Sequence, residues 1–223
     1  MNDDVILACF IPIAYLIGSI PFGLLVGKAK GIDPRKAGSG NIGATNIGRL
    51  LGGKYFALVF CLDMLKGAVP PLAAGAFISY RVQNWQTCLL WIAVAAAVVI
   101  GGMSSIYLKF KGGKGVATSA GIILGIFPYY TLAFVPGILA FFLAFATTRF
   151  ISVGSICGAT FFAVGYIAIG LIEHWPITGA QLPLLCFAIA LPLMILFKHR
   201  GNLARLRAGT EPRFVRKPSC ESK

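Results

Sequence analysis

The sequence predicts an all-α integral membrane protein with about seven helical segments. Of its 223 residues, 57% are hydrophobic and only 12% are charged, and the mean hydropathy of +0.82 is well above that of ordinary soluble domains. The apolar residues form runs long enough to cross a bilayer as helices, which takes about 20 residues each. We expect one membrane-embedded domain, residues 1–223, because the polar stretches between the runs are too short for a second domain.

The apolar runs define the helical segments in order. We expect them at about residues 5–27, 55–80, 87–108, 116–127, 131–148, 151–172 and 182–197. In the first segment, Gly18, Pro21, Gly23 and Gly27 predict a kinked or closely packed helix. In the second, Asp63 and Lys66 lie three residues apart, which favours an internal ion pair because isolated charge in a membrane helix is costly.

The uncharged stretch from residue 116 to residue 148 is too long for one comfortable span, and Pro128 offers a break. Basic residues gather in three places: the loop of residues 28–54, the loop of residues 109–114, and the tail from residue 198. The positive-inside rule places all three in the cytoplasm only if residues 116–148 cross an even number of times. We therefore expect a hairpin of two short helices, with the N-terminus outside and the C-terminus inside.

The charge balance limits the partners. Twenty Lys and Arg against seven Asp and Glu give a net charge of +13. The apolar runs exclude a soluble nucleic-acid-binding fold, so membrane lipid headgroups and anionic substrates are the expected partners. No cysteine pair has the spacing of a zinc site, and the sequence indicates no metal and no cofactor.

Three polar, glycine-bearing segments lie beside the spans. The first carries small polar residues and ends on an arginine, a set that can surround a phosphate: Ser39, Asn41, Thr45, Asn46 and Arg49. The second, Lys111-Gly112-Gly113-Lys114-Gly115, is no Walker motif, but its glycine turn can lead into a helix N-terminus that attracts anions. The third carries His199, Asn202 and Arg205, followed by Glu211, and His199 is a candidate general base.

Each segment also has a plain structural interpretation. The first can be a solvated loop with a helix cap, the second a set of positively charged anchors, and the third a basic helix lying on anionic lipid. Two other functions stay open on these grounds: a membrane transporter for a phosphorylated anionic solute, and a scaffold that binds anionic lipid.

Taken together, the motifs resemble those of the bacterial membrane acyl-phosphate:glycerol-3-phosphate acyltransferases, the PlsY family. The likeness extends over nearly the whole chain and rests on Gly18–Gly23, Ser39–Asn46, Leu62–Gly67, Phe110–Thr118 and the stretch from His199 to Glu211. It implies a seven-helix enzyme of the bacterial inner membrane with its active site facing the cytoplasm. The implied reaction transfers a fatty acyl group from acyl phosphate to the 1-hydroxyl of glycerol 3-phosphate, giving lysophosphatidate and phosphate.

The resemblance also implies roles for the site residues. Ser39, Arg49, Lys114, His199 and Asn202 would hold glycerol 3-phosphate, with Ser39, His199 and Asn202 expected to be catalytic. Asn41, Thr45 and Asn46 would line the acyl-phosphate side, and Glu211 would order the tail. The glycines and lysines of the middle motif, with Arg205, complete the predicted substrate-binding set: Lys111, Gly112, Gly113, Lys114 and Gly115.

One position departs from the family pattern, and the chemistry of the donor predicts the type of transfer. Similar proteins often carry histidine after a glycine where this chain has Gly102-Met103. An acyl phosphate already contains a good leaving group and no Gly-x-Ser-x-Gly elbow is present, so we expect direct transfer. The base is either His199 or a substrate phosphate oxygen.

Overall fold

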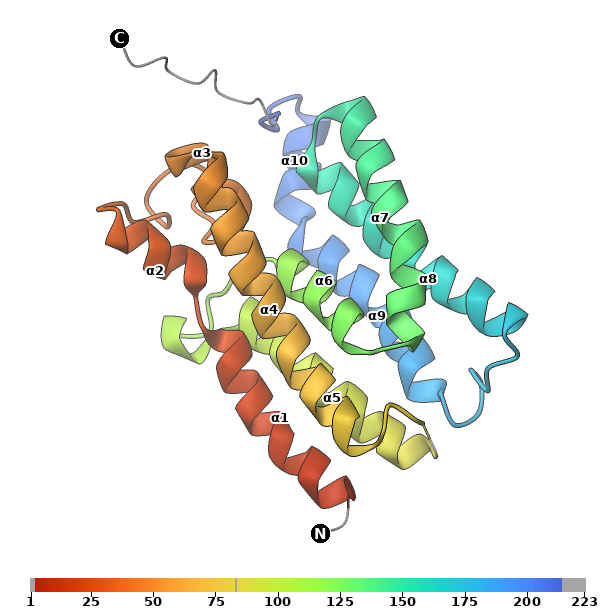
Figure 1. Ribbon diagram of the computed structural model, residues 1–223. Coiled ribbons are helices and arrows are strands. Elements are labelled where there is room, and N and C mark those ends of the chain that lie inside the picture. The colour runs from red at the N-terminus through yellow and green to blue at the C-terminus, as the bar shows by residue number, and fades with distance from the viewer. Residues whose placement is uncertain (1–2, 83, 214–223) are drawn as a thin grey trace.

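The computed structural model describes residues 3–82 and 84–213, and within these residues it is helical, with no strand (Figure 1). The elements are α1 (Asp3–Ser19), α2 (Phe22–Ala29), α3 (Ala44–Leu51), α4 (Gly53–Phe77), α5 (Trp85–Met103), the 3-10 turn η1 (Ile106–Leu108), α6 (Val116–Gly125), α7 (Tyr129–Thr148), α8 (Ile151–Ile172), α9 (Leu182–Lys198) and α10 (Arg200–Arg207).

The fold class is confirmed. Five stretches in the described part are long and apolar enough to cross a membrane, and the bent pair of α9 and α10 is a sixth. The remaining predicted segment is α6, an apolar helix of 10 residues. The structure adds two short helices that the sequence analysis did not separate, α3 and α10, which stand at the same end of the bundle (Figure 1).

The first predicted span is broken rather than continuous. Helix α1 ends at Ser19 and α2 begins at Phe22, because Pro21 cannot donate a backbone hydrogen bond at this point. At this break the carbonyl of Ile20 accepts a hydrogen bond of 2.7 Å from Lys66 Nζ, besides one of 3.2 Å from the N–H of Phe22. Lys66 also pairs with Asp63 at 2.7 Å, so the ion pair predicted inside the second span is present.

The hairpin of residues 116–148 is asymmetric, which corrects the expectation of two short arms. Helix α7 has 20 residues and is long enough to span the bilayer, whereas α6 has only 10. At 1.5 Å per residue, α6 is about 15 Å shorter than its partner. The turn of the hairpin lies at Pro128, and α6 covers only part of the length of α7 from that turn. The N-terminus of α6 therefore lies inside the bundle, and the basic loop before it reaches inward (Figure 1).

Close helix packing depends on glycine. A side chain at Gly18 would lie 2.2 Å from the carbonyl oxygen of Val98, and one at Gly67 would lie 2.2 Å from that of Thr118. These contacts bring α1 against α5 and α4 against α6 at distances that only glycine permits. The second of these contacts fixes the position of α6 against α4.

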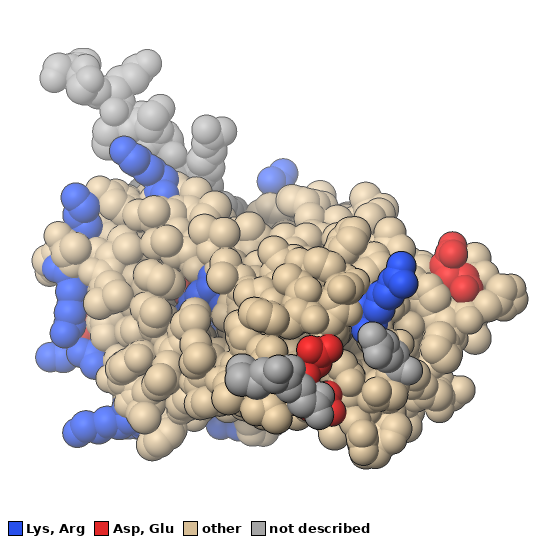
Figure 2. All heavy atoms as spheres, turned by 60° about the horizontal axis from the view of Figure 1, so that its bottom comes forward, with Lys and Arg blue, Asp and Glu red and all other residues tan. Residues whose placement is uncertain are grey.

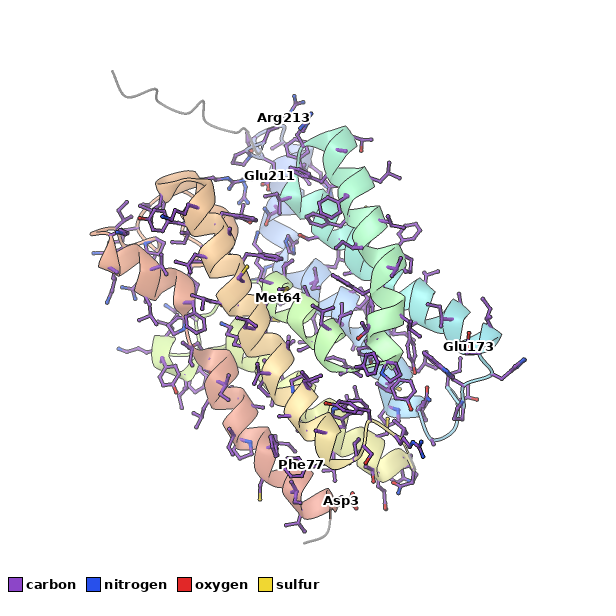
Figure 3. All side chains as sticks on the ribbon, viewed as in Figure 1. Asp3, Met64, Phe77, Glu173, Glu211 and Arg213 are labelled. Atoms are coloured by element: carbon purple, nitrogen blue, oxygen red, sulfur yellow. The ribbon has the colours of Figure 1, made fainter. Side chains whose placement is uncertain are left out.

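Charge is concentrated at the ends of the molecule. In Figure 2 most of the visible surface is uncharged, and Lys and Arg lie mainly along one edge. Figure 3 shows Asp3 and Phe77 at one end of the bundle and Glu211 and Arg213 at the other. This distribution is that of a protein with an apolar belt between two aqueous faces.

Candidate active site

A cavity of about 160 Å³ lies where the three polar segments meet. Its walls come from the break between α1 and α2, the loop before α3, helices α3 and α4, the loop before α6, the start of α8, and the junction of α9 and α10. All the predicted site residues line it except Lys111 and Gly112. Lys111 is exposed, and Gly112 packs on the backbone of Gly102 and Met103.

Asn46 shapes the loop that leads into α3. Its side-chain oxygen accepts from the backbone N–H of Ser39 at 2.9 Å, and its nitrogen donates to the carbonyls of Pro34, Ala37 and Asn41. Because Asn46 is 1% exposed and its amide is fully used within the loop, its part in the structure is to hold the loop rather than to offer donors to a ligand.

Arg49 reaches the cavity from α3. Its Nη2 donates to the carbonyl of Pro212 at 3.1 Å, while its Nε is buried and has no hydrogen-bond partner among the described residues. Burial lowers the pKa of Arg49 from its ordinary value, an effect that Glu211 opposes. A buried guanidinium nitrogen without a partner is costly, and the positive charge of this side chain beside the cavity favours an anionic ligand there.

Lys114 stands directly before α6. Gly115 precedes the helix with φ +75°, and no side chain caps the helix start. The first helical hydrogen bond of α6 runs from the N–H of Ser119 to the carbonyl of Gly115. The N–H groups before Ser119, in the first turn, therefore have no partner within the helix. Burial lowers the pKa of Lys114 to about 8. Its ammonium donates to Asn202 Oδ1.

His199 lies at the bend of 54° between α9 and α10. Its Nδ1 lies 2.8 Å from the carbonyl oxygen of Ile195, which can only accept, so Nδ1 carries the proton and Nε2 is the acceptor nitrogen. Burial, and then the charge of Lys114, lower the pKa of His199 to about 4. At neutral pH the ring is therefore uncharged and can accept a proton at Nε2.

Glu211 holds the tail segment against the site. It is 8% exposed and accepts hydrogen bonds from Asn202 at 2.5 Å, from Arg205 at 2.8 Å and from Ser152 at 3.1 Å. Burial alone would raise the pKa of Glu211, but these hydrogen bonds lower it overall. The resulting chain from Lys114 through Asn202 to Glu211 and Arg205 joins the second polar segment to the third.

Several lining residues were not predicted from the sequence. Ser152 and Ser155 come from the start of α8, and Ser19 comes from the end of α1, where its hydroxyl is buried without a hydrogen-bond partner in the described part of the chain. Asp63 and Lys66 lie in the lining as well, although they were predicted only as an ion pair. Ser152 and Ser155 stand inside an apolar run and carry no local signal, whereas Ser19 lies within Gly18–Gly23, which contributed only to the family resemblance.

The cavity also has an apolar wall. Phe56 and Phe60 of α4, whose ring centroids are 5.8 Å apart, face it together with Phe141 of α7 and Ile151 of α8. One end thus offers cations and free N–H groups, and this wall offers aromatic and aliphatic surface. Such a site suits a ligand with an anionic head and an apolar chain.

The sequence comparisons agree with one another. A family model described as glycerol-3-phosphate acyltransferase matches residues 8–209. A glycerol-3-phosphate acyltransferase from Geobacter sulfurreducens is 41% identical over 204 residues, which cover 91% of this chain and 94% of the relative. A protein of the same name from Synechococcus elongatus is 42% identical over 205 residues, which cover 91% of each chain.

Solved structures match over a similar length. The crystal structure of PlsY (YgiH), an integral membrane glycerol 3-phosphate acyltransferase, in its glycerol 3-phosphate form has a TM-score of 0.75 and 36% identity, covering 96% of both chains. The lysophosphatidic acid form of PlsY matches with a TM-score of 0.73 and 35% identity over the same share of each chain.

Proposed function

The chain belongs to the glycerol-3-phosphate acyltransferase family, and we propose that it transfers a fatty acyl group from acyl phosphate to the 1-hydroxyl of sn-glycerol 3-phosphate. The products are lysophosphatidate and inorganic phosphate, and the reaction is the first acylation of phospholipid synthesis. One observation carries the proposal: Arg49, whose buried Nε has no hydrogen-bond partner among the described residues, lines the same cavity as Lys114, the open N-terminus of α6 and a wall of aromatic side chains.

The binding roles follow from the charge and hydrogen-bonding capacity of each residue. We assign glycerol 3-phosphate to Ser39, Arg49, Lys114, His199 and Asn202, since these supply two cations, an imidazole and short polar groups. Asn41 and Thr45, with the N–H groups of α3, face the acyl phosphate. Asn46 is assigned to the loop and Glu211 to the tail, because the hydrogen bonds that each makes within the protein already occupy it.

The chemistry needs little from the protein beyond positioning and charge. The 1-hydroxyl oxygen attacks the acyl carbonyl carbon, the bond from that carbon to the phosphate oxygen breaks, and phosphate leaves with the electron pair. Two anionic substrates repel each other, so cations that hold both supply much of the rate by proximity and electrostatic stabilisation. No covalent enzyme intermediate is required.

The proton of the attacking hydroxyl has two possible acceptors. Neutral His199 presents Nε2, but burial lowers its pKa to about 4, which makes it a weak base, and a phosphate dianion bound beside it would raise that pKa. A phosphate oxygen of the substrate is the second acceptor. The active site is placed on the cytoplasmic side of the bacterial inner membrane in this proposal, because the basic segments surround it.

The family match favours this enzyme over the transporter and the lipid scaffold that the charge pattern alone left open. The structural match to a solved acyltransferase, which covers 96% of both chains, supports the same choice.

The test is turnover by purified protein in detergent or lipid cubic phase, with palmitoyl phosphate and glycerol 3-phosphate as substrates. Released phosphate and lysophosphatidate are followed together, and palmitoyl-CoA serves as a parallel donor. We expect turnover with acyl phosphate, and its loss in Ser39→Ala and His199→Ala. His174→Ala is the matched control, since His174 lies in the loop after α8 and does not line the cavity.

Turnover with palmitoyl-CoA alone would overturn the proposed donor. Folded wild-type protein that turns over neither donor would overturn the proposed function. Equal losses in His174→Ala and His199→Ala would remove the site assignment.

A further inference from the structure

Met103 packs against the loop of residues 109–115, which carries Lys114, on the side away from the cavity. It is the last residue of α5, it is 4% exposed, and it is absent from the cavity lining. Nothing in the proposed reaction uses it, and a buried thioether has no acid–base chemistry to contribute. Its contacts nevertheless connect two of the three polar segments.

The side chain of Met103 packs against Gly115. A Cβ at Gly115 would lie 2.6 Å from Met103 Cε and 3.0 Å from Met103 Cγ, so the methionine occupies the volume that any side chain there would need. Gly115 has φ +75° and carries the turn from Lys114 into α6. The position of this turn therefore depends on the methionine below it.

The backbone of the loop rests on the same support. The N–H of Gly113 donates to the carbonyl of Gly102 at 3.0 Å, and a Cβ at Gly112 would lie 2.6 Å from the carbonyl carbon of Met103. The loop thus lies directly on the C-terminal end of α5. Glycine is required at position 112 for this close approach.

Met103 also contacts the third polar segment. Its carbonyl accepts a hydrogen bond of 3.0 Å from Lys198 Nζ, and Lys198 directly precedes His199. The side chain of Met103 thereby contacts the turn that carries Lys114. The main chain of Met103 contacts the helix end that carries His199.

We propose that Met103 is a positioning residue, which sets the location of Lys114 and the α6 N-terminus relative to His199 and so controls the affinity for the phosphate of glycerol 3-phosphate. The inference rests on the proposed function for the identity of that phosphate. An unbranched side chain fills the space under Gly115, whereas alanine leaves a void into which the turn settles away from Asn202. Small displacements of a binding group are enough to weaken a phosphate contact.

The test compares Met103→Ala and Met103→Leu with Met194→Ala. Met194 is a methionine of α9 that packs on the apolar core and lies outside the cavity. We expect Met103→Ala to raise KM for glycerol 3-phosphate about tenfold while kcat changes by less than about threefold. Met103→Leu is expected to restore most of the affinity because it refills the volume, and Met194→Ala is expected to leave KM unchanged.

A binding measurement separates this inference from the proposed function. Calorimetric Kd values for inorganic phosphate and for glycerol 3-phosphate require no turnover, so they test the positioning even if acyl phosphate proves to be the wrong donor. A Kd in Met103→Ala equal to that of the wild type would overturn the inference. So would parallel losses of Tm and activity in Met103→Ala and Met194→Ala, which would show a general packing defect. If Met103→Ala does not fold, wild-type Kd values in Met103→Val, whose side chain lacks the Sδ and Cε atoms that lie under Gly115, would overturn it.

Discussion

Lys114 is the residue through which pH acts most directly on the cavity. Burial lowers its pKa to about 8; Arg205 and Arg49 lower it as well, Glu211 opposes them, and the neighbouring His199 is neutral above about pH 5. In the proposed role only the protonated form binds phosphate, so the affinity is fully present well below pH 8 and is lost as the pH rises through that value.

The corresponding prediction is that KM for glycerol 3-phosphate rises above about pH 8, by up to about tenfold per pH unit, while kcat stays flatter. Lys114→Arg keeps the charge at these pH values, so its KM should stay level even if its absolute value is higher. Steady-state kinetics between about pH 6.5 and 9.5 check this. An unchanged rise in Lys114→Arg would assign the titration to another group.

Asn46, in the first turn of α3, and Asn41, in the loop before that helix, have the same side chain but differ in their hydrogen bonding. Asn46 makes four hydrogen bonds within the loop, whereas Asn41 accepts one from the N–H of Gly43. We expect Asn46→Ala to lower the stability by about 2–4 kcal/mol and to reduce kcat/KM for both substrates, because the loop loses its centre. Asn41→Ala should leave Tm within a few degrees and mainly raise KM for acyl phosphate.

Thermal unfolding combined with kinetics on the two variants distinguishes these outcomes. Equal Tm values for Asn46→Ala and the wild type would show that the loop holds its shape without the amide.

At this scale the sequence predicts the residues that stand in polar, glycine-bearing segments. It does not predict Ser152, whose hydroxyl reaches Glu211 across 59 positions of the chain, because no neighbour in sequence marks that serine. It marks Met103 only as a position where similar proteins often carry histidine, and the packing of Met103 on Gly115 is visible only in the structure. Asn46 was predicted to line the acyl-phosphate side, and only its hydrogen bonds reveal that its amide is already occupied.

Helix α6 owes its place to its contact with α4. Gly67 lies so close to Thr118 that an added Cβ would be 2.2 Å from the carbonyl oxygen, and this contact lies two turns or less from Lys114. We expect Gly67→Ala to cost about 1–3 kcal/mol through overpacking and to raise KM for glycerol 3-phosphate, because α6 is pushed away from the cavity.

Gly53→Ala is the matched control, since Gly53 begins the same helix and has no atom within 4 Å of an added Cβ. Thermal unfolding in detergent and KM for both variants make the comparison. A Gly67→Ala protein with the Tm and KM of the Gly53→Ala protein would mean that the two helices separate without consequence.

Among the elements, hydropathy predicts lengths well where a run has clear ends. Helix α8 begins and ends at the predicted residues 151 and 172. Pro128 predicted the turn of the hairpin correctly. The hydropathy of an uncharged run does not show where the helices on either side of a turn begin and end, so the unequal lengths of the two arms were not predicted. The break at Pro21 was predicted as a kink because proline removes a backbone donor. Helices α3 and α10 were not predicted as separate elements, because they are too short and too polar to form apolar runs.

The molecule as a whole assembles its site from segments far apart in the chain. The cavity collects side chains from the α1–α2 break, from α3 and α4, from the loop before α6 and from the α9–α10 junction. Each segment emerges at the same end of the bundle because α6 and α7 return the chain to that end before α8 begins (Figure 1). The number of times that residues 116–148 cross the membrane therefore decides whether the three basic segments can lie on the same side and meet.

This dependence leads to a prediction about topology in the cell. With the N-terminus outside, an even number of crossings places the α7–α8 turn inside and the α8–α9 loop outside. Alkaline phosphatase, active only outside the cytoplasm, should be inactive when fused after Arg149 and active when fused after Glu173, and green fluorescent protein should give the opposite pattern. Both reporters reversed at both points would mean that α6 and α7 cross only once between them. The positively charged third segment would then stand outside, on the far side of the membrane from Lys114, and the hydrogen bond from Lys114 to Asn202 that joins the two segments could not form.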